Sequence, residues 1–416
     1  MKLKPSPFAP ASFPKLPTVK GVRGATASRG FYAKRGVERD DVFLFTFPEG
    51  TTAAGVFTRS HTASADVDWC RAALEAGTGR GRALVVNAGN SNAFTGKAGV
   101  EKNDATLKAM SETLGIPRDN CFIAATGVIG EPLADPNYVG EMLPILSDRL
   151  GAPDWEMCAR AFMTTDTFPK GAGGQCEIDG VAVSVSGILK GSGMIMPNMA
   201  TMLAYVFTDA AISAPVLDAL LREAVDETLN SVTVDGDTST SDSCMIFATG
   251  ASGAPMIDSV DDERLDDFRR VLGDTFRDLS HQLVKDGEGA SKFVEIEVRG
   301  AVSSESAKAI GMHIANSPLI KTAIAAGDAN LGRIVMAVGK SLEPVNKDEM
   351  RIWFGDHLVA EGGMRAHGYD EPTASAHFAQ DQIRIQVDVA AGTAAWRVWT
   401  CDLTHAYVDI NGAYRT

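Results

Sequence analysis

The chain has 416 residues, a formal net charge of −14 and a pI of about 5.0. A chain of this length forms one large domain or two to three ordinary ones. The net negative charge argues against nonspecific binding to nucleic acid, because such binding depends on neutralising phosphates. It favours a protein that acts on small molecules.

The cysteine pattern and the first residues bear on the cell compartment. Six cysteines are widely scattered, with no CxxC pair and no histidine at ligand spacing, which indicates reduced core residues and no metal site. Residues 1–20 are rich in proline and lack a continuous apolar signal segment, and no apolar stretch approaches the length of a membrane span. We therefore expect a cytoplasmic protein without a nucleic-acid or membrane partner.

Apolar periodicity predicts strands and helices along the whole chain. The strands are expected at 42–47, 53–57, 82–87, 122–125, 181–189, 202–207, 293–298, 351–354, 382–389 and 394–400. The helices are expected at 103–114, at 135–150 with an interruption or kink at Pro144, from Ser213 onward, at 261–283 and at 304–315. A further loop rich in glycine, aspartate and asparagine is expected over 321–332.

Two strand exits in the first half carry residues of interest. The Asn-rich loop 88–97 ends in Lys97, but its glycine spacing is wrong for a phosphate-binding loop, and Ala98 stands where Ser or Thr is required. We interpret this loop as a turn that supports a nearby site. Thr126 and Gly127 can present a hydroxyl and a backbone N–H to one point, as an oxyanion hole requires, although a Thr-Gly pair is usually an ordinary turn.

Four further polar positions have both a functional and a structural interpretation. Residues 163–167 (MTTDT) are typical of a solvated turn or a helix cap. Lys190 follows a buried run and could bind a substrate carboxylate, although lysine is usually exposed. The DxD spacing at 235–237 lacks the rest of a calcium loop and favours a hydrogen-bonded turn. Glu288 lies between two glycines, where it could pair with a substrate ammonium or be a solvated turn residue.

The stretch from Lys190 to Leu203, KGSGMIMPNMATML, joins two apolar strands near the middle of the chain. A Thr201 hydroxyl held open after the Pro-Asn turn at 197–198 could attack the Ala200 carbonyl and shift the acyl group from nitrogen to oxygen. Hydrolysis of that ester would leave Thr201 as a new N-terminus. Its α-amine, with a reference pKa of roughly 7.7–8.0, could then serve as the base for its own hydroxyl. The alternative is a threonine at a strand start, packed through its methyl group.

Several segments resemble the ornithine acetyltransferase (glutamate N-acetyltransferase) family of arginine biosynthesis. In chain order they are NAGNSNAFTG, IAATGVIG, MTTDTFPK, KGSGMIMPNMATML, TVDGDTSTSD, KDGEGASK, SPLIKTAIAAGDANLGRI and NGAYRT. They cover nearly the whole chain in the family's order, so the resemblance is specific. Three segments depart from the sequence that is commoner in the family: NAGNSNAF, TSTSD and ANLGR. These departures bear on fine substrate preference only.

The resemblance implies a precursor that cuts itself between Ala200 and Thr201. The products would be an α chain, residues 1–200, and a β chain, residues 201–416, assembled as an α2β2 heterotetramer. The implied fold is α/β, a layered αββα-type sandwich with a smaller C-terminal α/β part. It resembles N-terminal-nucleophile hydrolases in chemistry and differs from them in topology. Neither a cofactor nor a metal is implied.

The resemblance also assigns roles to individual residues. Thr201 matches the family's nucleophile, and Thr126 with Gly127 match its oxyanion hole. The positions that match substrate contacts are Thr164, Lys190, Thr201, Glu288, Asn411 and Thr416.

The implied reaction is a transfer of the acetyl group from N-acetylornithine to glutamate through an acetyl ester on Thr201. Lys190 could hold the α-carboxylate that both amino acids carry, and Glu288 could pair with the extra ammonium of ornithine. Acetyl-CoA is a candidate second donor, which would make the enzyme bifunctional. One alternative is a self-processed aminopeptidase or amidase of related fold that transfers its acyl group to water. Another is an uncut α/β protein that only binds an amino acid.

Overall fold

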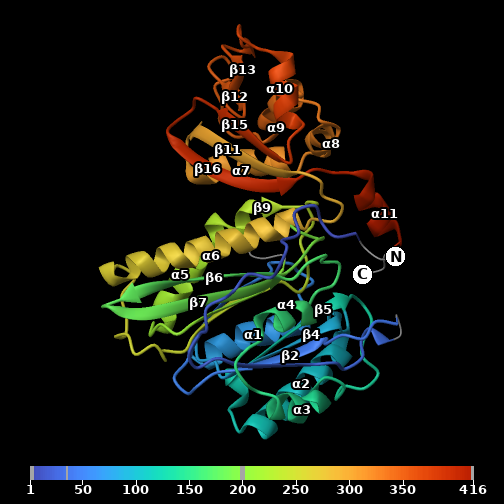
Figure 1. Ribbon diagram of the computed structural model, residues 1–416, viewed down its shortest axis with the longest axis vertical. Helices are drawn as coiled ribbons and strands as arrows, with labels where there is room; N and C mark the ends of the chain where they lie inside the picture. The colour runs from blue at the N-terminus through green and yellow to red at the C-terminus, as the bar shows by residue number, and fades with distance from the viewer. Residues whose placement is uncertain (1–3, 34–35, 197–201, 414–416) are drawn as a thin grey trace.

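The computed structural model describes residues 4–33, 36–196 and 202–413 (Figure 1). Within these residues the chain forms two sheets packed face to face, and a third sheet carries the last quarter of the chain. Predicted strands such as 42–47, 53–57 and 82–87 are present, and nearly all of their side chains are buried on both faces. Among the described helices, none is long and apolar enough to cross a membrane.

The first sheet comes entirely from the N-terminal part of the chain. Its order is β1-β2-β4-β5, and its strands are β1 (Arg23–Ala27), β2 (Val42–Thr46), β4 (Ala83–Asn90) and β5 (Cys121–Val128). Neighbouring β4 and β5 run parallel, so their carboxyl ends lie side by side. Two helices cover its outer face, α2 (Gly96–Leu114) and α3 (Leu143–Asp148).

The second sheet combines strands from both sides of the Ala200–Thr201 bond. Its order is β3-β10-β8-β7-β6, and its strands are β3 (Thr52–Phe57), β10 (Ser243–Ala248), β8 (Leu203–Thr208), β7 (Val181–Lys190) and β6 (Lys170–Ile178). Strands β8 and β10, from the second half of the chain, lie between β3 and β7 from the first half. The register pairs Lys190 at the end of β7 with Leu203 at the start of β8.

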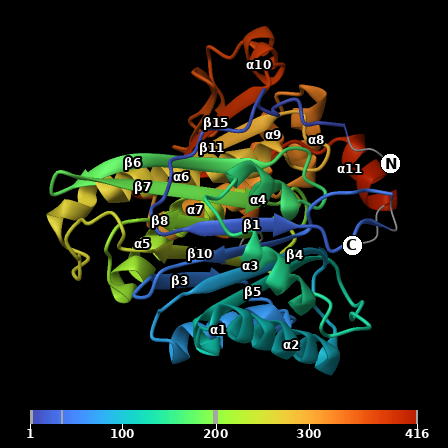
Figure 2. The same cartoon turned by 60° about the horizontal axis from the view of Figure 1, so that its bottom comes forward.

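Helices on the outer face of the second sheet complete four layers. Helix α5 (Ala214–Glu227) and helix α6 (Asp266–Lys285) bury their apolar faces against it. Figure 1 shows this order of layers with α6 beyond β6 and β7, and Figure 2 shows α2 beyond β4 and β5. Helices α1 (Ala65–Ala76) and α4 (Trp155–Ala161) close the edges of the sandwich, where they add buried side chains to the core between the two sheets. The expected αββα arrangement is confirmed.

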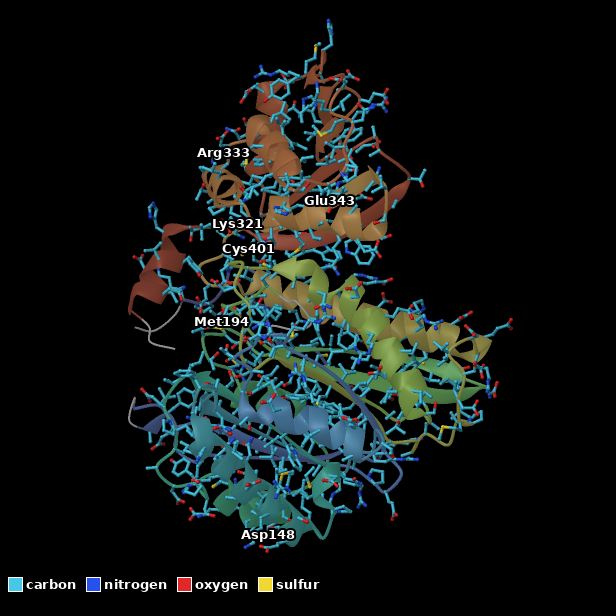
Figure 3. All side chains as sticks on the ribbon, turned by 180° about the vertical axis from the view of Figure 1, so that it is seen from behind. Asp148, Met194, Lys321, Arg333, Glu343 and Cys401 are labelled. Carbon is cyan, nitrogen blue, oxygen red and sulfur yellow. The ribbon has the colours of Figure 1, made fainter. Side chains whose placement is uncertain are left out.

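Residues 293–401, together with the short strand β9 (Val232–Thr233) from earlier in the chain, form the expected smaller α/β part. Its sheet has the order β14-β13-β12-β15-β11-β16-β9, with β11 (Phe293–Ala301), β12 (Arg351–Phe354), β13 (His357–Glu361), β14 (Met364–Arg365), β15 (Gln382–Asp388) and β16 (Ala394–Cys401). Its helices are α7 (Ser304–Ala315), α8 (Pro318–Ala326), α9 (Leu331–Lys340) and α10 (Glu371–Phe378). A buried lysine, Lys321, donates to Thr400 Oγ1 (2.8 Å) and lies beside Cys401, close to the sandwich (Figure 3).

Several predicted boundaries were wrong. The helix expected at 135–150 begins only at Leu143, and Pro144 lies in its first turn, where it breaks no hydrogen bond and causes no kink. Helix α2 begins at Gly96 instead of residue 103. Most of the loop expected at 321–332 is helical, because α8 ends at Ala326 with Gly327 in the left-handed conformation. The terminal helix α11 (His405–Ala413) was not predicted.

The core between the two sheets is aromatic. The Phe45 and Phe207 rings lie 4.6 Å apart, and the Phe47 and Phe247 rings stack at 4.4 Å, each pair joining the first sheet to the second. All six cysteines are buried and free, which confirms the prediction of reduced core residues.

We expect Phe207→Ala to lower the free energy of unfolding by about 3–5 kcal/mol, because it leaves a cavity at the centre of this core. A urea titration followed by tryptophan fluorescence measures the change. The matched control is Phe94→Ala, at a side chain 82% exposed, which should change the value by less than about 0.5 kcal/mol. Equal effects of the two substitutions would contradict the packing described.

Candidate active site

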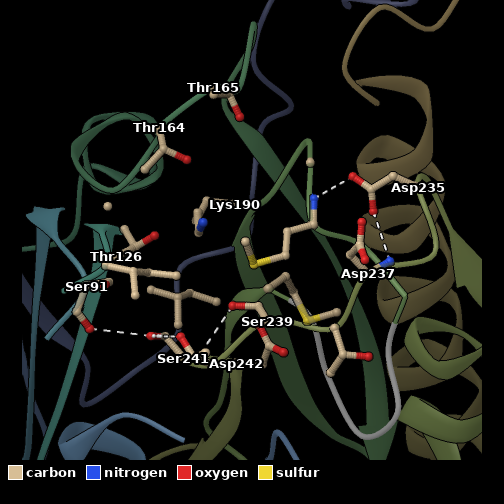
Figure 4. Close-up of a pocket in the computed structure, with 18 of the residues that line it drawn as sticks. Ser91, Thr126, Thr164, Thr165, Lys190, Asp235, Asp237, Ser239, Ser241 and Asp242 are labelled. Atoms are coloured by element: carbon tan, nitrogen blue, oxygen red, sulfur yellow. Dashed lines mark hydrogen bonds between the residues drawn. The ribbon is translucent and has the colours of Figure 1, made fainter. Parts of the chain in front are cut away.

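A cavity of about 310 Å³ opens at the edge of the second sheet where β7 ends and β8 and β10 begin. Six of the residues that the sequence singled out line it: Thr126, Gly127, Thr164, Lys190, Glu288 and Asn411. They come from β5, the loop before β6, the end of β7, the turn after α6, and α11. Figure 4 shows Thr126, Thr164 and Lys190 around this one space.

Three predicted site residues, Ala200, Thr201 and Thr416, lie outside the described residues. Met202, the residue bonded to Thr201 on its C-terminal side, lines the cavity. Its carbonyl oxygen accepts a hydrogen bond from Ser243 N (3.0 Å), so the beginning of β8 is fixed at the cavity wall.

The Thr126-Gly127 pair lies in the last part of β5, which extends further than the predicted strand. Gly127 has φ +128°, and a Cβ there would lie 2.5 Å from the Gly89 carbonyl carbon of the neighbouring strand. Only glycine fits this position, because the two backbones approach too closely for any side chain. The chain therefore places the Gly127 backbone and the Thr126 side chain at the cavity wall, and within the described part of the chain the Thr126 hydroxyl makes no hydrogen bond.

A fully buried ion cluster lies behind this cavity. Lys170 Nζ is 2.6 Å from Asp166 Oδ1 and 2.6 Å from Asp286 Oδ2, and all three side chains are 0–1% exposed. Burial would raise the pKa of Asp166, but the ammonium groups of Lys170 and Lys190 outweigh it and lower that pKa to about 2. Burial would lower the pKa of Lys170, and the two carboxylates raise it instead. Residues 163–167 are therefore not the solvated turn that their composition indicates.

The two aspartates of this cluster also hold the loops that line the cavity, Asp166 through its carboxylate and Asp286 through its backbone carbonyl. Asp166 accepts hydrogen bonds from Thr164 N (2.9 Å) and from Gly191 N (2.7 Å), the residue after Lys190. The Asp286 carbonyl oxygen accepts from Ser192 Oγ (2.6 Å), and Ser192 O accepts from Glu288 N (3.0 Å). One buried cluster thus sets the positions of Thr164, of the chain after Lys190, and of Glu288.

Lys190 extends into the cavity from the end of β7. Burial lowers its pKa, while the nearby carboxylates of Asp166 and Asp242 oppose that shift. Within the described residues, its ammonium donates no hydrogen bond to the protein. A half-buried cation of this kind is suited to bind a carboxylate of a ligand.

Glu288 also lines the cavity and is 8% exposed. Burial raises its pKa, and hydrogen bonds from Asn411 and Thr165 oppose the rise. Asn411 Nδ2 donates to Glu288 Oε2 at 2.7 Å, so α11 completes the site. A Cβ on Gly193 would lie 2.5 Å from the Glu288 carboxyl carbon, so the glycine leaves the space that this side chain occupies.

Sequence reasoning missed some of the polar lining. Ser91, from the Asn-rich loop, and Ser241 line the cavity, and Ser241 Oγ donates to Ser91 O (3.4 Å) (Figure 4). Asp242 is 2% exposed, and burial raises its pKa well above the usual range. Its position directly before the apolar strand β10 was the available signal.

The described residues contain no group of three or more His, Cys, Asp and Glu side chains that could hold a metal ion. The groups that line the cavity are hydroxyls, a backbone N–H, an ammonium and carboxylates. Such a set can hold an amino acid by its carboxylate and its ammonium next to a hydroxyl nucleophile.

Comparison with known proteins identifies the family. A family model described as the ArgJ family matches residues 26–416. The "Arginine biosynthesis bifunctional protein ArgJ" of Mesorhizobium japonicum is 50% identical over 415 residues, which cover 99% of both chains. The protein of the same name from Brucella suis biovar 1 is 49% identical over 419 residues and 100% of both chains. The chain belongs to the ArgJ family.

Membership of the ArgJ family confirms the resemblance found in the sequence segments, and with it the prediction of an enzyme of arginine biosynthesis. Two solved structures are also similar. The arginine biosynthesis bifunctional protein ArgJ of Bacillus halodurans is 36% identical, with a TM-score of 0.48 over 50% of this chain and 96% of that chain. The ornithine acetyltransferase of Mycobacterium tuberculosis, complexed with ornithine, is 29% identical, with a TM-score of 0.37 over 43% of this chain and 93% of that chain.

The buried cluster yields a pH-dependent prediction. Lys170→Met should lower the free energy of unfolding at pH 7 by roughly 3–5 kcal/mol, because it leaves two buried carboxylates without their cation. The pKa of Asp166 is lowered in the folded state. Its carboxylate therefore contributes to the free energy of unfolding at pH values above its unfolded-state pKa of about 3.9, and this contribution is lost as the pH falls towards 2. The difference between wild type and variant should therefore narrow between about pH 4 and pH 2, as urea titrations at several pH values would show.

The control for this prediction is Lys108→Met. Lys108 forms an exposed ion pair with Glu112 (3.9 Å), and its loss should cost less than about 0.5 kcal/mol at any pH. A Lys170→Met protein as stable as this control at pH 7 would show that the cluster does not stabilise the fold.

Proposed function

We propose that the chain is an acetyltransferase that moves the acetyl group from N-acetylornithine to glutamate through an ester on Thr201. The observation that carries the proposal is the meeting of Thr126, Gly127, Lys190 and Glu288 around one cavity. Met202, which is bonded to Thr201, lines the same cavity. The names of the ArgJ relatives, which place them in arginine biosynthesis, support the choice of substrates.

The first step of the proposed mechanism is self-cleavage. The Thr201 hydroxyl attacks the Ala200 carbonyl carbon, the C–N bond breaks, and the amine takes up a proton, which leaves an ester between the two residues. Water then hydrolyses this ester, so that Ala200 ends in a carboxylate and Thr201 regains its hydroxyl beside a free α-amine. That amine has a reference pKa of roughly 7.7–8.0 and is able to accept the proton of the hydroxyl.

The first half of the proposed transfer makes the acetyl-enzyme. Thr201 Oγ attacks the acetyl carbonyl of N-acetylornithine, and the Thr126 hydroxyl and the Gly127 N–H stabilise the oxyanion. The C–N bond then breaks, and the ornithine α-nitrogen leaves with a proton. Lys190 holds the α-carboxylate in this scheme, and Glu288, oriented by Asn411, pairs with the side-chain ammonium.

The second half regenerates the enzyme. The α-amine of glutamate attacks the ester carbonyl, the proton that it loses returns to the Thr201 oxygen, and N-acetylglutamate leaves. Thr164 and Thr416 are the remaining proposed substrate contacts. Acetyl-CoA is a proposed second acetyl donor at the same threonine, in line with the word bifunctional in the relatives' names.

The proposal includes the products of cleavage, an α chain of residues 1–200 and a β chain of residues 201–416, paired as an α2β2 heterotetramer. The pairing of β8 with β7 and of β10 with β3 supports the association of the α chain with the β chain, because these ladders join the two pieces without the peptide bond. The cavity likewise takes residues from both pieces.

Intact-mass analysis under denaturing conditions tests the cleavage. The wild-type protein should give two species that divide between Ala200 and Thr201, and Thr201→Ala should give one uncut species without acetyl transfer. Thr322→Ala, at an exposed threonine of α8, is the control and should behave as wild type. A wild-type protein that stays whole yet transfers acetyl groups would remove Thr201 from the mechanism.

Thr126→Ala tests the oxyanion hole. We expect cleaved protein whose rate of acetyl transfer from N-acetylornithine to glutamate is about 10²–10³ lower, because one donor to the oxyanion is lost. The thermal unfolding midpoint should change little. Unchanged turnover would refute the assignment. Omitting glutamate separates the transferase from a hydrolase, since only a hydrolase releases acetate at full rate without the acceptor.

A further inference from the structure

The DxD turn at 235–237 has no role in the reaction proposed above. It follows β9 and lies against residues 194–196, the last described residues before the segment that contains Ala200 and Thr201. Figure 4 shows Asp235 facing the backbone of this segment.

Hydrogen bonds with residues 233–238 hold four backbone groups of residues 194–196. Asp235 accepts from Met194 N (Oδ2, 2.7 Å) and from Ile195 N (Oδ1, 2.8 Å). Val234 N donates to Ile195 O (2.7 Å), and Thr238 Oγ1 donates to Met196 O (2.9 Å). We call this set of contacts the 233–238 clamp.

The clamp holds a backbone conformation that the chain would otherwise avoid. Met194 has φ +58°, in the left-handed region that is unfavourable for a residue with a long side chain. The two N–H groups bound by Asp235 belong to Met194 and the next residue, so the carboxylate fixes this turn directly. Tyr407 of α11 adds a long contact to Asp235 Oδ2 (3.5 Å) from the other side.

The other end of the segment is fixed as well, since Met202 O accepts from Ser243 N. Residues 197–201 therefore connect two anchored points, Met196 and Met202. An intramolecular attack is fast only when the reacting groups are held together, so the fixed positions of Met196 and Met202 bear on the rate of a cut between them.

We propose that Asp235 is a positioning residue for self-cleavage, which it promotes by holding the Met194-Ile195 turn through their two backbone N–H groups. This inference rests on the proposed cleavage between Ala200 and Thr201. Asp235 touches neither of the reacting residues in this scheme and acts through residues 194–196. The residues of the clamp follow position 201, so the two future pieces hold each other before the bond is cut.

The test measures the rate at which freshly purified precursor is cut, by intact mass over time. Asp235→Ala should slow cleavage by about tenfold or more, because two hydrogen bonds to a charged acceptor are lost. Thr238→Val removes only the bond to Met196 O and should slow it less. Asp237→Ala is the matched control, since it removes the same charge from an exposed side chain of the same turn that makes no hydrogen bond to residues 194–196 in the described part of the chain, and its cleavage should stay within about twofold of wild type.

Acetyl transfer per cleaved chain is the second readout. A general loss of structure would lower transfer and cleavage together, whereas loss of the clamp should lower cleavage more than transfer. If Asp235→Ala does not fold, Thr238→Val against Asp237→Ala decides the question. The inference would be overturned if Asp235→Ala were cut at the same rate as Asp237→Ala. If Asp235→Ala does not fold, cleavage of Thr238→Val at the rate of Asp237→Ala would overturn it. A wild-type protein that is never cut would instead refute the proposed function.

Discussion

The ammonium of Lys170, buried between Asp166 and Asp286, is the interaction on which the arrangement of the cavity depends. A charge without exposure to water has to be paired, so these three groups fix one another within hydrogen-bond distance. Because Asp166 also binds Gly191 N, the constraint reaches the chain that follows β7. The buried ion cluster therefore holds the polar residues of the cavity in place, and their positions do not depend on flexible surface loops.

The cavity itself balances charges of opposite sign. Lys190 faces the buried carboxylates of Asp242 and Glu288, and burial shifts the pKa of each of these three groups towards its neutral form. Such a site can accept an amino acid that carries both a carboxylate and an ammonium, because the ligand's charges replace the missing water.

Much of the sandwich was predictable, because its strands are long apolar runs whose burial on both faces leaves a clear pattern. The cavity residues were found through segments resembling a known family, and Thr126 or Glu288 alone gave only weak signals. The ion cluster could not be found in this way, since Asp286 is 116 residues from Lys170 in the sequence and no local pattern links them. Helix α11 was missed because its sequence has little amphipathic pattern, although its Asn411 side chain completes the site.

The order of strands in the second sheet has a consequence for how the protein is made. Strands β10 and β8 fill the space between β3 and β7, so residues 1–200 alone would supply a sheet with two central strands missing. Folding of the intact chain is a unimolecular process, whereas two separate pieces would have to find each other. Renaturation of a cut protein should consequently depend on its concentration, while renaturation of an uncut precursor should not. The peptide bond at the centre of the chain thus keeps all the strands of this sheet in one molecule while it folds.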